Sequence, residues 1–132
     1  MSGRYAIVSV GTNSTRLLLA DVSGEVPHVA LERTIGTRIG EGLGESGPLG
    51  TEPMQRTLDA MAQLQRAVRG RYVRLFAIAT SALRRAENGD EFLARAGDLL
   101  GVPVRVLSGD DEASASYRGA ITVLGRIAPG GA

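Results

Sequence analysis

The sequence predicts an α/β domain, built on a five-stranded mixed sheet with helices on both faces. Two observations lead to this prediction. Three short apolar runs, typical of β-strands, come first in the chain. Segments with helical periodicity then alternate with two further apolar runs, which is the pattern of strand–helix–strand crossovers.

Three strands are expected at the beginning of the chain. Residues 5–10 form an apolar run, residues 11–14 are a turn signal, and residues 15–22 form a second apolar run. Residues 23–24 suit a tight turn. Residues 28–38 alternate loosely in hydrophobicity, as a third strand would, so the three runs predict a meander.

A loop and a long helix are expected next. Residues 36–50 are rich in glycine and predict a loop. Residues 52–69 carry apolar side chains at steps of three and four, which is the stripe of an amphipathic helix. Thr51 is the expected N-cap of this helix, and Gly70 is expected to end it.

The next segment alternates between strand and helix. Residues 73–79 predict a strand apolar enough to be buried on both faces, and residues 80–86 predict a short helix. Asp90 is the expected N-cap of a further helix that ends at Gly101. Residues 102–107 predict the fifth strand.

One more helix is expected over residues 108–123. We therefore predict a single domain over residues 1–124, with residues 125–132 as a tail or the start of a linker. A meander followed by strand–helix–strand crossovers is the ribonuclease-H-like order of elements.

Composition excludes several classes of function. The net charge of +1 gives no basic excess that would favour nucleic acid, and no apolar run is long enough for a membrane span. The chain has no cysteine, so thiolate metal sites are excluded, and it opens without a secretory signal pattern. We expect a soluble, cytoplasmic protein. All 15 basic residues are arginine, which suits phosphate, although genomic base composition explains the same bias.

The first candidate for chemistry is the turn after the first strand. Its residues are Gly11, Thr12, Asn13, Ser14 and, just beyond, Arg16. Backbone N–H groups, hydroxyls and a guanidinium at such a turn can bind an anion. An ordinary turn, in which glycine and asparagine serve geometry alone, is the alternative.

The second candidate follows the fourth strand. Thr80 or Ser81 can cap a short helix whose N-terminus attracts phosphate, and Arg84 lies one turn inside that helix. Helix capping with a solvated arginine is the alternative.

The third candidate is the acidic start of the last expected helix. Asp110, Asp111 and Glu112 follow the fifth strand, and one of these carboxylates could orient a water as a general base. Acidic residues in a first helical turn also favour the helix dipole, which is the alternative. Because the three candidates all follow strands, we expect them to meet at one edge of the sheet.

The three motifs together resemble the exopolyphosphatase and guanosine-pentaphosphate phosphatase family. Residues 8–17 (VSVGTNSTRL) are similar to I-D-x-G-S-N-S-x-R-L, and residues 79–88 (ATSALRRAEN) to A-T-S-A-x-R-x-A-x-N. Residues 108–113 (SGDDEA) are similar to S-G-x-E-E-A, and residues 38–43 (RIGEGL) to R-L-G-E-G-L. The resemblance extends over about residues 5–121.

The resemblance implies a fold of the actin, sugar kinase and heat-shock ATPase superfamily. It also implies hydrolysis of terminal phosphates from polyphosphate, or of the 5′ phosphate of guanosine pentaphosphate, with Mg²⁺. By position Glu112 would be the catalytic base and Arg84 would neutralise the phosphate chain. The remaining phosphate-binding residues implied are Thr12, Asn13, Ser14 and Arg16.

Two departures from the family pattern matter. Ser9 replaces the aspartate of the first motif, and a neutral hydroxyl is a poor magnesium ligand, so the metal ligands stay undefined. The family's second glycine-rich phosphate loop would begin beyond residue 132. We therefore expect a second lobe to complete the active site, and little activity from this chain alone.

Other functions remain open at this point. Ser9 is compatible with a non-catalytic phosphate sensor or partner-binding domain. A small-molecule kinase of the same superfamily is the third possibility, against which residues 108–113 argue. Without its second lobe the domain would expose an apolar face, so we expect homodimers or aggregation.

Overall fold

The protein is described by a computed structural model, which covers residues 3–21, 28–42 and 47–107. Its elements, in chain order, are β1 (Arg4–Val10), β2 (Thr15–Asp21), β3 (His28–Ile35), α1 (Thr51–Val68), β4 (Arg74–Ala79), α2 (Ala82–Arg85), α3 (Gly89–Leu100) and β5 (Val104–Val106). None of the helices in these ranges is both long and apolar enough to cross a bilayer.

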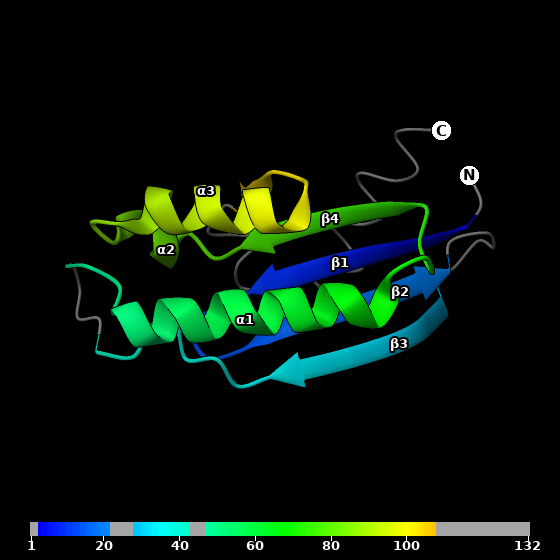
Figure 1. The fold of residues 1–132 in the computed structure, drawn as a ribbon, viewed down its shortest axis with the longest axis horizontal. Helices are drawn as coiled ribbons and strands as arrows, with labels where there is room; N and C mark the ends of the chain where they lie inside the picture. Colours follow the sequence, from blue (N-terminus) through cyan, green and yellow to red (C-terminus); the bar gives the residue numbers. More distant parts are fainter. Residues whose placement is uncertain (1–2, 22–27, 43–46, 108–132) are drawn as a thin grey trace.

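The strands form one five-stranded sheet in the order β3-β2-β1-β4-β5. Figure 1 shows β3, β2, β1 and β4 side by side. The β1–β2 and β2–β3 pairs are antiparallel, whereas β1–β4 and β4–β5 are parallel. The predicted meander and the two crossovers are confirmed, and the sheet is mixed as expected. The parallel strands β1, β4 and β5 end at the same edge of the sheet, which is the edge where α/β proteins bind ligands.

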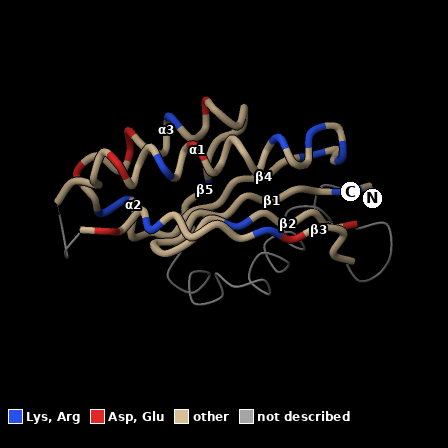
Figure 2. Tube along the Cα trace, turned by 60° about the horizontal axis from the view of Figure 1, so that its bottom comes forward, with Lys and Arg blue, Asp and Glu red and all other residues tan. Residues whose placement is uncertain are grey.

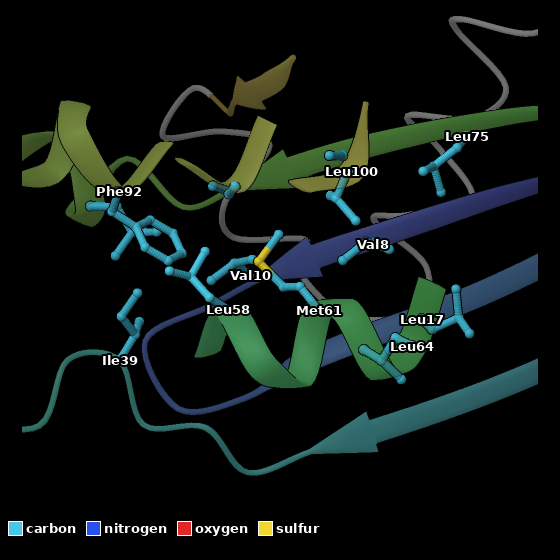
Figure 3. Packing of buried hydrophobic residues seen from close by; sticks show 14 of the residues in the cluster. Val8, Val10, Leu17, Ile39, Leu58, Met61, Leu64, Leu75, Phe92 and Leu100 are labelled. Carbon is cyan, nitrogen blue, oxygen red and sulfur yellow. The ribbon is translucent and has the colours of Figure 1, made fainter. Parts of the chain in front are cut away.

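The main core lies between the sheet and the helices. Alternate residues of β1, β2 and β4 face α1 and α3, which supply the other half of this core (Figure 3). From the strands come Ala6, Val8, Val10, Leu17, Leu19, Leu75, Ala77 and Ala79, and from the helices Met54, Leu58, Met61, Leu64, Val68, Phe92, Ala96 and Leu100. The apolar stripe predicted for α1 is therefore its buried face.

The opposite face of the sheet carries a second buried cluster. It consists of Tyr5, Ile7, Leu18, Ala20, Ile78 and Leu107. The helices α1 and α3 both lie on the first face (Figure 2). The helix predicted over residues 108–123, which would supply the second helical layer, lies outside the described residues, as does the turn predicted at 23–24.

The structure corrects both predicted helix caps. Thr51 is the first residue of α1, and Gly50 is the N-cap, without a side-chain hydrogen bond. Asp90 lies in the first turn of α3, and Asn88 occupies the cap position. The Asn88 side chain does not cap α3 because it binds the backbone of Leu49, to which it donates at 3.2 Å and from which it accepts at 2.7 Å.

Two strands are shorter than their hydrophobic patterns. β3 ends at Ile35 instead of residue 38, because Thr37 turns its hydroxyl inward to Thr15 at 2.8 Å. β5 covers Val104–Val106 instead of residues 102–107, and Pro103, which has no N–H to donate to a ladder, precedes it.

Candidate functional site

The β1–β2 turn contains backbone N–H groups without a hydrogen-bond acceptor among the described residues. Gly11 donates its N–H to the carbonyl of Ser14 at 2.9 Å, which closes the turn. Within the described residues, the N–H groups of Thr12, Asn13 and Ser14 have no acceptor. Thr12 and Asn13 are also exposed. A run of unpaired backbone N–H groups in a tight turn is the concavity that binds phosphate oxygens.

The carbonyls of this turn, by contrast, are occupied by a second segment. The N–H of Arg38 donates to the carbonyl of Asn13 at 3.0 Å, and that of Gly40 donates to Thr12 at 3.2 Å. A Cβ at Gly40 would lie only 3.3 Å from Cβ of Thr12, so glycine permits this close approach. The segment 38–40 therefore fixes the turn with its acceptors satisfied and its donors free.

Ser9 and Arg16 lie side by side on the face of the sheet opposite α1. They are direct cross-strand partners in the β1–β2 register. Thr34 continues the same row on β3, and Arg105 continues it on β5 through Ile78. This row therefore places polar and cationic side chains on both sides of Ile78, a member of the apolar cluster on this face.

The second candidate segment starts directly beside the first. The N–H of Thr80 donates to the carbonyl of Val10 at 3.1 Å, so the end of β4 is joined to the end of β1. Thr80 Oγ1 accepts a hydrogen bond from the N–H of Ala82 at 3.4 Å, and Ser81 is the N-cap residue of α2. Ser81 therefore occupies the N-cap position, whereas the hydroxyl that accepts a hydrogen bond from the start of the helix is that of Thr80.

Arg84 is exposed on α2. Its backbone N–H donates to the carbonyl of Ser81 at 3.0 Å, which closes the first turn of this short helix. In the described part of the chain, its guanidinium makes no ion pair. An exposed arginine without an internal partner is available to an anionic ligand.

The third candidate segment begins at the same edge. The N–H of Leu107 donates to the carbonyl of Ala79 at 2.9 Å, so residue 107 lies next to the end of β4. Val10 and Ala79 are register partners, and Leu107, the residue after β5, bonds to Ala79. Each of the three leads directly into a candidate segment. Glu112, Asp110 and Asp111 themselves lie outside the described residues.

The described part of the chain carries no cluster of metal-ligating side chains. No group of three or more histidine, cysteine, aspartate or glutamate side chains gathers within residues 3–21, 28–42 and 47–107. The edge offers hydroxyls, amides and guanidinium groups, whereas Mg²⁺ is held mainly by carboxylates and water. Ser9, half-buried between Arg16 and Ile78, does not replace a carboxylate there.

Comparison with known proteins decides the family. Residues 18–130 match the model of the Ppx/GppA phosphatase family. The chain belongs to the Ppx/GppA phosphatase family. This match confirms the family that the three motifs resemble. The predicted actin-like fold class is confirmed by the solved structures described below.

Two curated relatives illustrate the similarity. Exopolyphosphatase 2 of Mycobacterium tuberculosis H37Rv is 36% identical over 133 residues, which cover 92% of this chain and 41% of the relative. The guanosine-5'-triphosphate,3'-diphosphate pyrophosphatase of Vibrio cholerae O395 is 32% identical over 128 residues, covering 93% of this chain and 25% of the relative. The chain thus spans less than half the length of these relatives.

Solved structures agree with the described fold. The Aquifex aeolicus Ppx/GppA phosphatase superposes with a TM-score of 0.75 at 30% identity, covering 81% of this chain and 36% of that one. An archaeal actin homolog, Ta0583, has a TM-score of 0.50 at 15% identity, covering 96% of this chain and 49% of that one, and shows the fold alone.

Sequence reasoning missed the segment that fixes the turn. The sequence of residues 38–43 resembles the family pattern but indicates no structural role, whereas in the structure Arg38 and Gly40 bond directly to the candidate turn. The run of glycines indicated a loop. No local pattern shows which other segment a loop contacts, so this role was not predictable.

Proposed function

We propose that this chain is one lobe of a two-lobed phosphoanhydride hydrolase. The enzyme would release terminal phosphates from inorganic polyphosphate, or the 5′ phosphate of guanosine pentaphosphate. The observation that carries the proposal is the junction at the sheet edge, where the carbonyl of Val10 bonds to Thr80 and that of Ala79 bonds to Leu107. This junction supports the proposal, because each of the three strand ends that it joins leads directly into a candidate segment.

The described residues fit the binding half of this reaction. The free N–H groups of Thr12, Asn13 and Ser14 would hold oxygens of the terminal phosphate. Arg84 and Arg16 would neutralise the charge of the chain, assisted by the Thr80 and Ser81 hydroxyls. Phosphoryl transfer depends mainly on positioning and on stabilisation of negative charge, and both are supplied by groups of this kind.

The chemical step would use Glu112 as general base. Its carboxylate would accept a proton from a water as the water oxygen bonds to the terminal phosphorus. The bond from that phosphorus to the bridging oxygen breaks, and the products are orthophosphate and a phosphate chain shorter by one unit. When Mg²⁺ is bound, it would supply further charge neutralisation.

A polypeptide that joins this chain to the second lobe of a Ppx/GppA relative tests the proposal. Glu112→Gln should reduce phosphate release from long-chain polyphosphate by about 10²-fold or more while leaving binding intact, because the base is lost and the donors remain. Release is measured as free orthophosphate with Mg²⁺ present. Asp110→Asn is the matched control, and unchanged release in Glu112→Gln would exclude the base role.

A non-catalytic phosphate sensor is the second candidate. Ser9, which stands where the family pattern has an aspartate, favours it. The same two-lobed polypeptide discriminates: a sensor binds polyphosphate without releasing orthophosphate, whereas an enzyme releases it with Ser9 in place.

A further inference from the structure

We propose that Arg38 is a phosphate-contacting residue of this site, which binds the phosphate next to the terminal one. The proposal rests on the proposed function, because it assigns Arg38 to the same phosphate chain. It adds a specificity determinant: a residue that favours chains over single phosphate ions. Four features of the loop support it.

The backbone of Arg38 lies against the candidate turn. Its N–H donates to the carbonyl of Asn13 at 3.0 Å, and its carbonyl accepts from the N–H of Glu41 at 2.9 Å. Arg38 therefore starts next to the residues whose own N–H groups are free. A long cationic side chain anchored at this point is within reach of an anion held by the turn.

Arg38 adopts an unfavourable backbone conformation. Its φ angle is +48°, and within the described residues no other non-glycine residue has a positive φ. Residues with a Cβ rarely adopt this region, in which glycine is at ease. Glycine is abundant nearby, at Gly36, Gly40 and Gly42, so an arginine here is costly without a role. Strain of this kind gathers at functional sites.

The neighbours of Arg38 hold this conformation in place. Thr37 is fully buried and its hydroxyl lies 2.8 Å from that of Thr15, and Ile39 is fully buried in the main core. Arg56 of α1 donates from Nε to the carbonyl of Thr37 at 2.8 Å and also pairs with Glu41 at 3.5 Å. Two buried side chains and one hydrogen-bonded arginine thus fix the backbone on both sides of Arg38.

The side chain of Arg38 itself is not used within the fold. It is exposed, and in the described part of the chain its guanidinium has no hydrogen bond or ion pair. Arg56, by contrast, is bound to two partners of the same loop, so the two arginines differ in role. An unpartnered guanidinium on a fixed backbone can bind two phosphate oxygens through its planar fork.

The test is calorimetric titration of the 132-residue chain with inorganic tripolyphosphate and with orthophosphate, at one fixed ionic strength. Arg38→Gly removes the guanidinium and suits the positive φ, so the variant should melt no lower than the wild type. It should bind tripolyphosphate about tenfold more weakly, as expected for loss of a charge-assisted hydrogen bond, and bind orthophosphate as before. Arg38→Lys keeps the charge but loses the two-pronged guanidinium, so its affinity for tripolyphosphate should lie between those of Arg38→Gly and the wild type.

Arg69→Gln is the matched control, because it removes one exposed positive charge at the far end of α1 (Figure 1). Its affinity should equal that of the wild type. Equal tripolyphosphate affinity in Arg38→Gly and wild type would overturn the role of Arg38 and leave the proposed function standing. Absence of binding by the wild type would contradict the proposed function itself, and the role of Arg38 with it.

Discussion

Two buried threonines connect the core to the candidate site. The Oγ1 atoms of Thr15 and Thr37 lie 2.8 Å apart, and both residues are fully buried. Thr15 follows the β1–β2 turn directly, and Thr37 precedes Arg38. This pair therefore holds the turn and the segment that fixes it in one position, although neither residue touches the proposed ligand.

Removal of one hydroxyl should be more costly than removal of both. Thr37→Val leaves the Thr15 hydroxyl buried without a partner, so we expect a loss of about 1–3 kcal/mol in the free energy of unfolding. Thr15→Val with Thr37→Val replaces both groups by methyls of the same shape and should recover much of that loss. Urea unfolding measures Thr37→Val, the single variant Thr15→Val and the double variant, and strictly additive effects would contradict a direct bond between the hydroxyls.

At the scale of elements, the α2–α3 junction fixes the far end of the glycine-rich loop. The Asn88 side chain bonds to the N–H and carbonyl of Leu49, and the N–H of Glu87 donates to the carbonyl of Gly47 at 2.9 Å. The loop is thus attached to the β1–β2 turn at one end and to this junction at the other. The sheet edge and the helices are connected through it.

Gly89→Ala should be severely destabilising. A Cβ at Gly89 would collide with the carbonyl oxygen of Leu83, a backbone atom that cannot move without shifting α2. We expect a loss of about 3 kcal/mol or more, within the range of the largest single-residue effects. Gly97→Ala, in the same helix, is the control: its Cβ would lie 3.3 Å from the Val102 carbonyl, and the gain in helix propensity should offset most of that contact. Thermal melts that rank the two variants equally would contradict this packing.

The sequence predicted the elements better than their ends or their contacts. Hydrophobic periodicity located all five strands and α1, because burial on one face or on both leaves a direct pattern. The predicted N-cap of α3, Asp90, was wrong, because Asn88 occupies that position. The Asn88 side chain bonds to the backbone of Leu49 instead of to α3, a contact that no local pattern encodes. The bracing of the turn by Arg38 was missed for the same reason.

At the scale of the whole molecule, the parallel strands bring distant segments together. The strands β1, β4 and β5 end at the same edge, and a backbone hydrogen bond joins the end of β1 to the residue after β4, and the end of β4 to the residue after β5. The order of elements predicted this convergence, and the hydrogen bond from Thr80 to Val10 joins the starts of the first two motifs. That the two motifs share one phosphate stays a prediction. The same holds for the position of Glu112 at this edge.

Self-association of the chain also stays a prediction. In the described part, Val73 is the large apolar side chain that is exposed, at 64%. If a further apolar face were bare in solution, the apparent mass in static light scattering should rise with protein concentration. A constant monomer mass up to high concentration would argue against the expected dimer.

The most direct test of convergence at the sheet edge is mapping of backbone amide chemical shifts by NMR during titration with inorganic tripolyphosphate. We expect the amides of Thr12, Asn13 and Ser14 to shift together with those of Ser81 and Arg84 along one binding curve, because one ligand contacts both segments. Glu112 should join them if the acidic motif faces the same site. Shifts confined to one segment, or found at the opposite end of the sheet near Arg4 and Val73, would contradict a shared phosphate site.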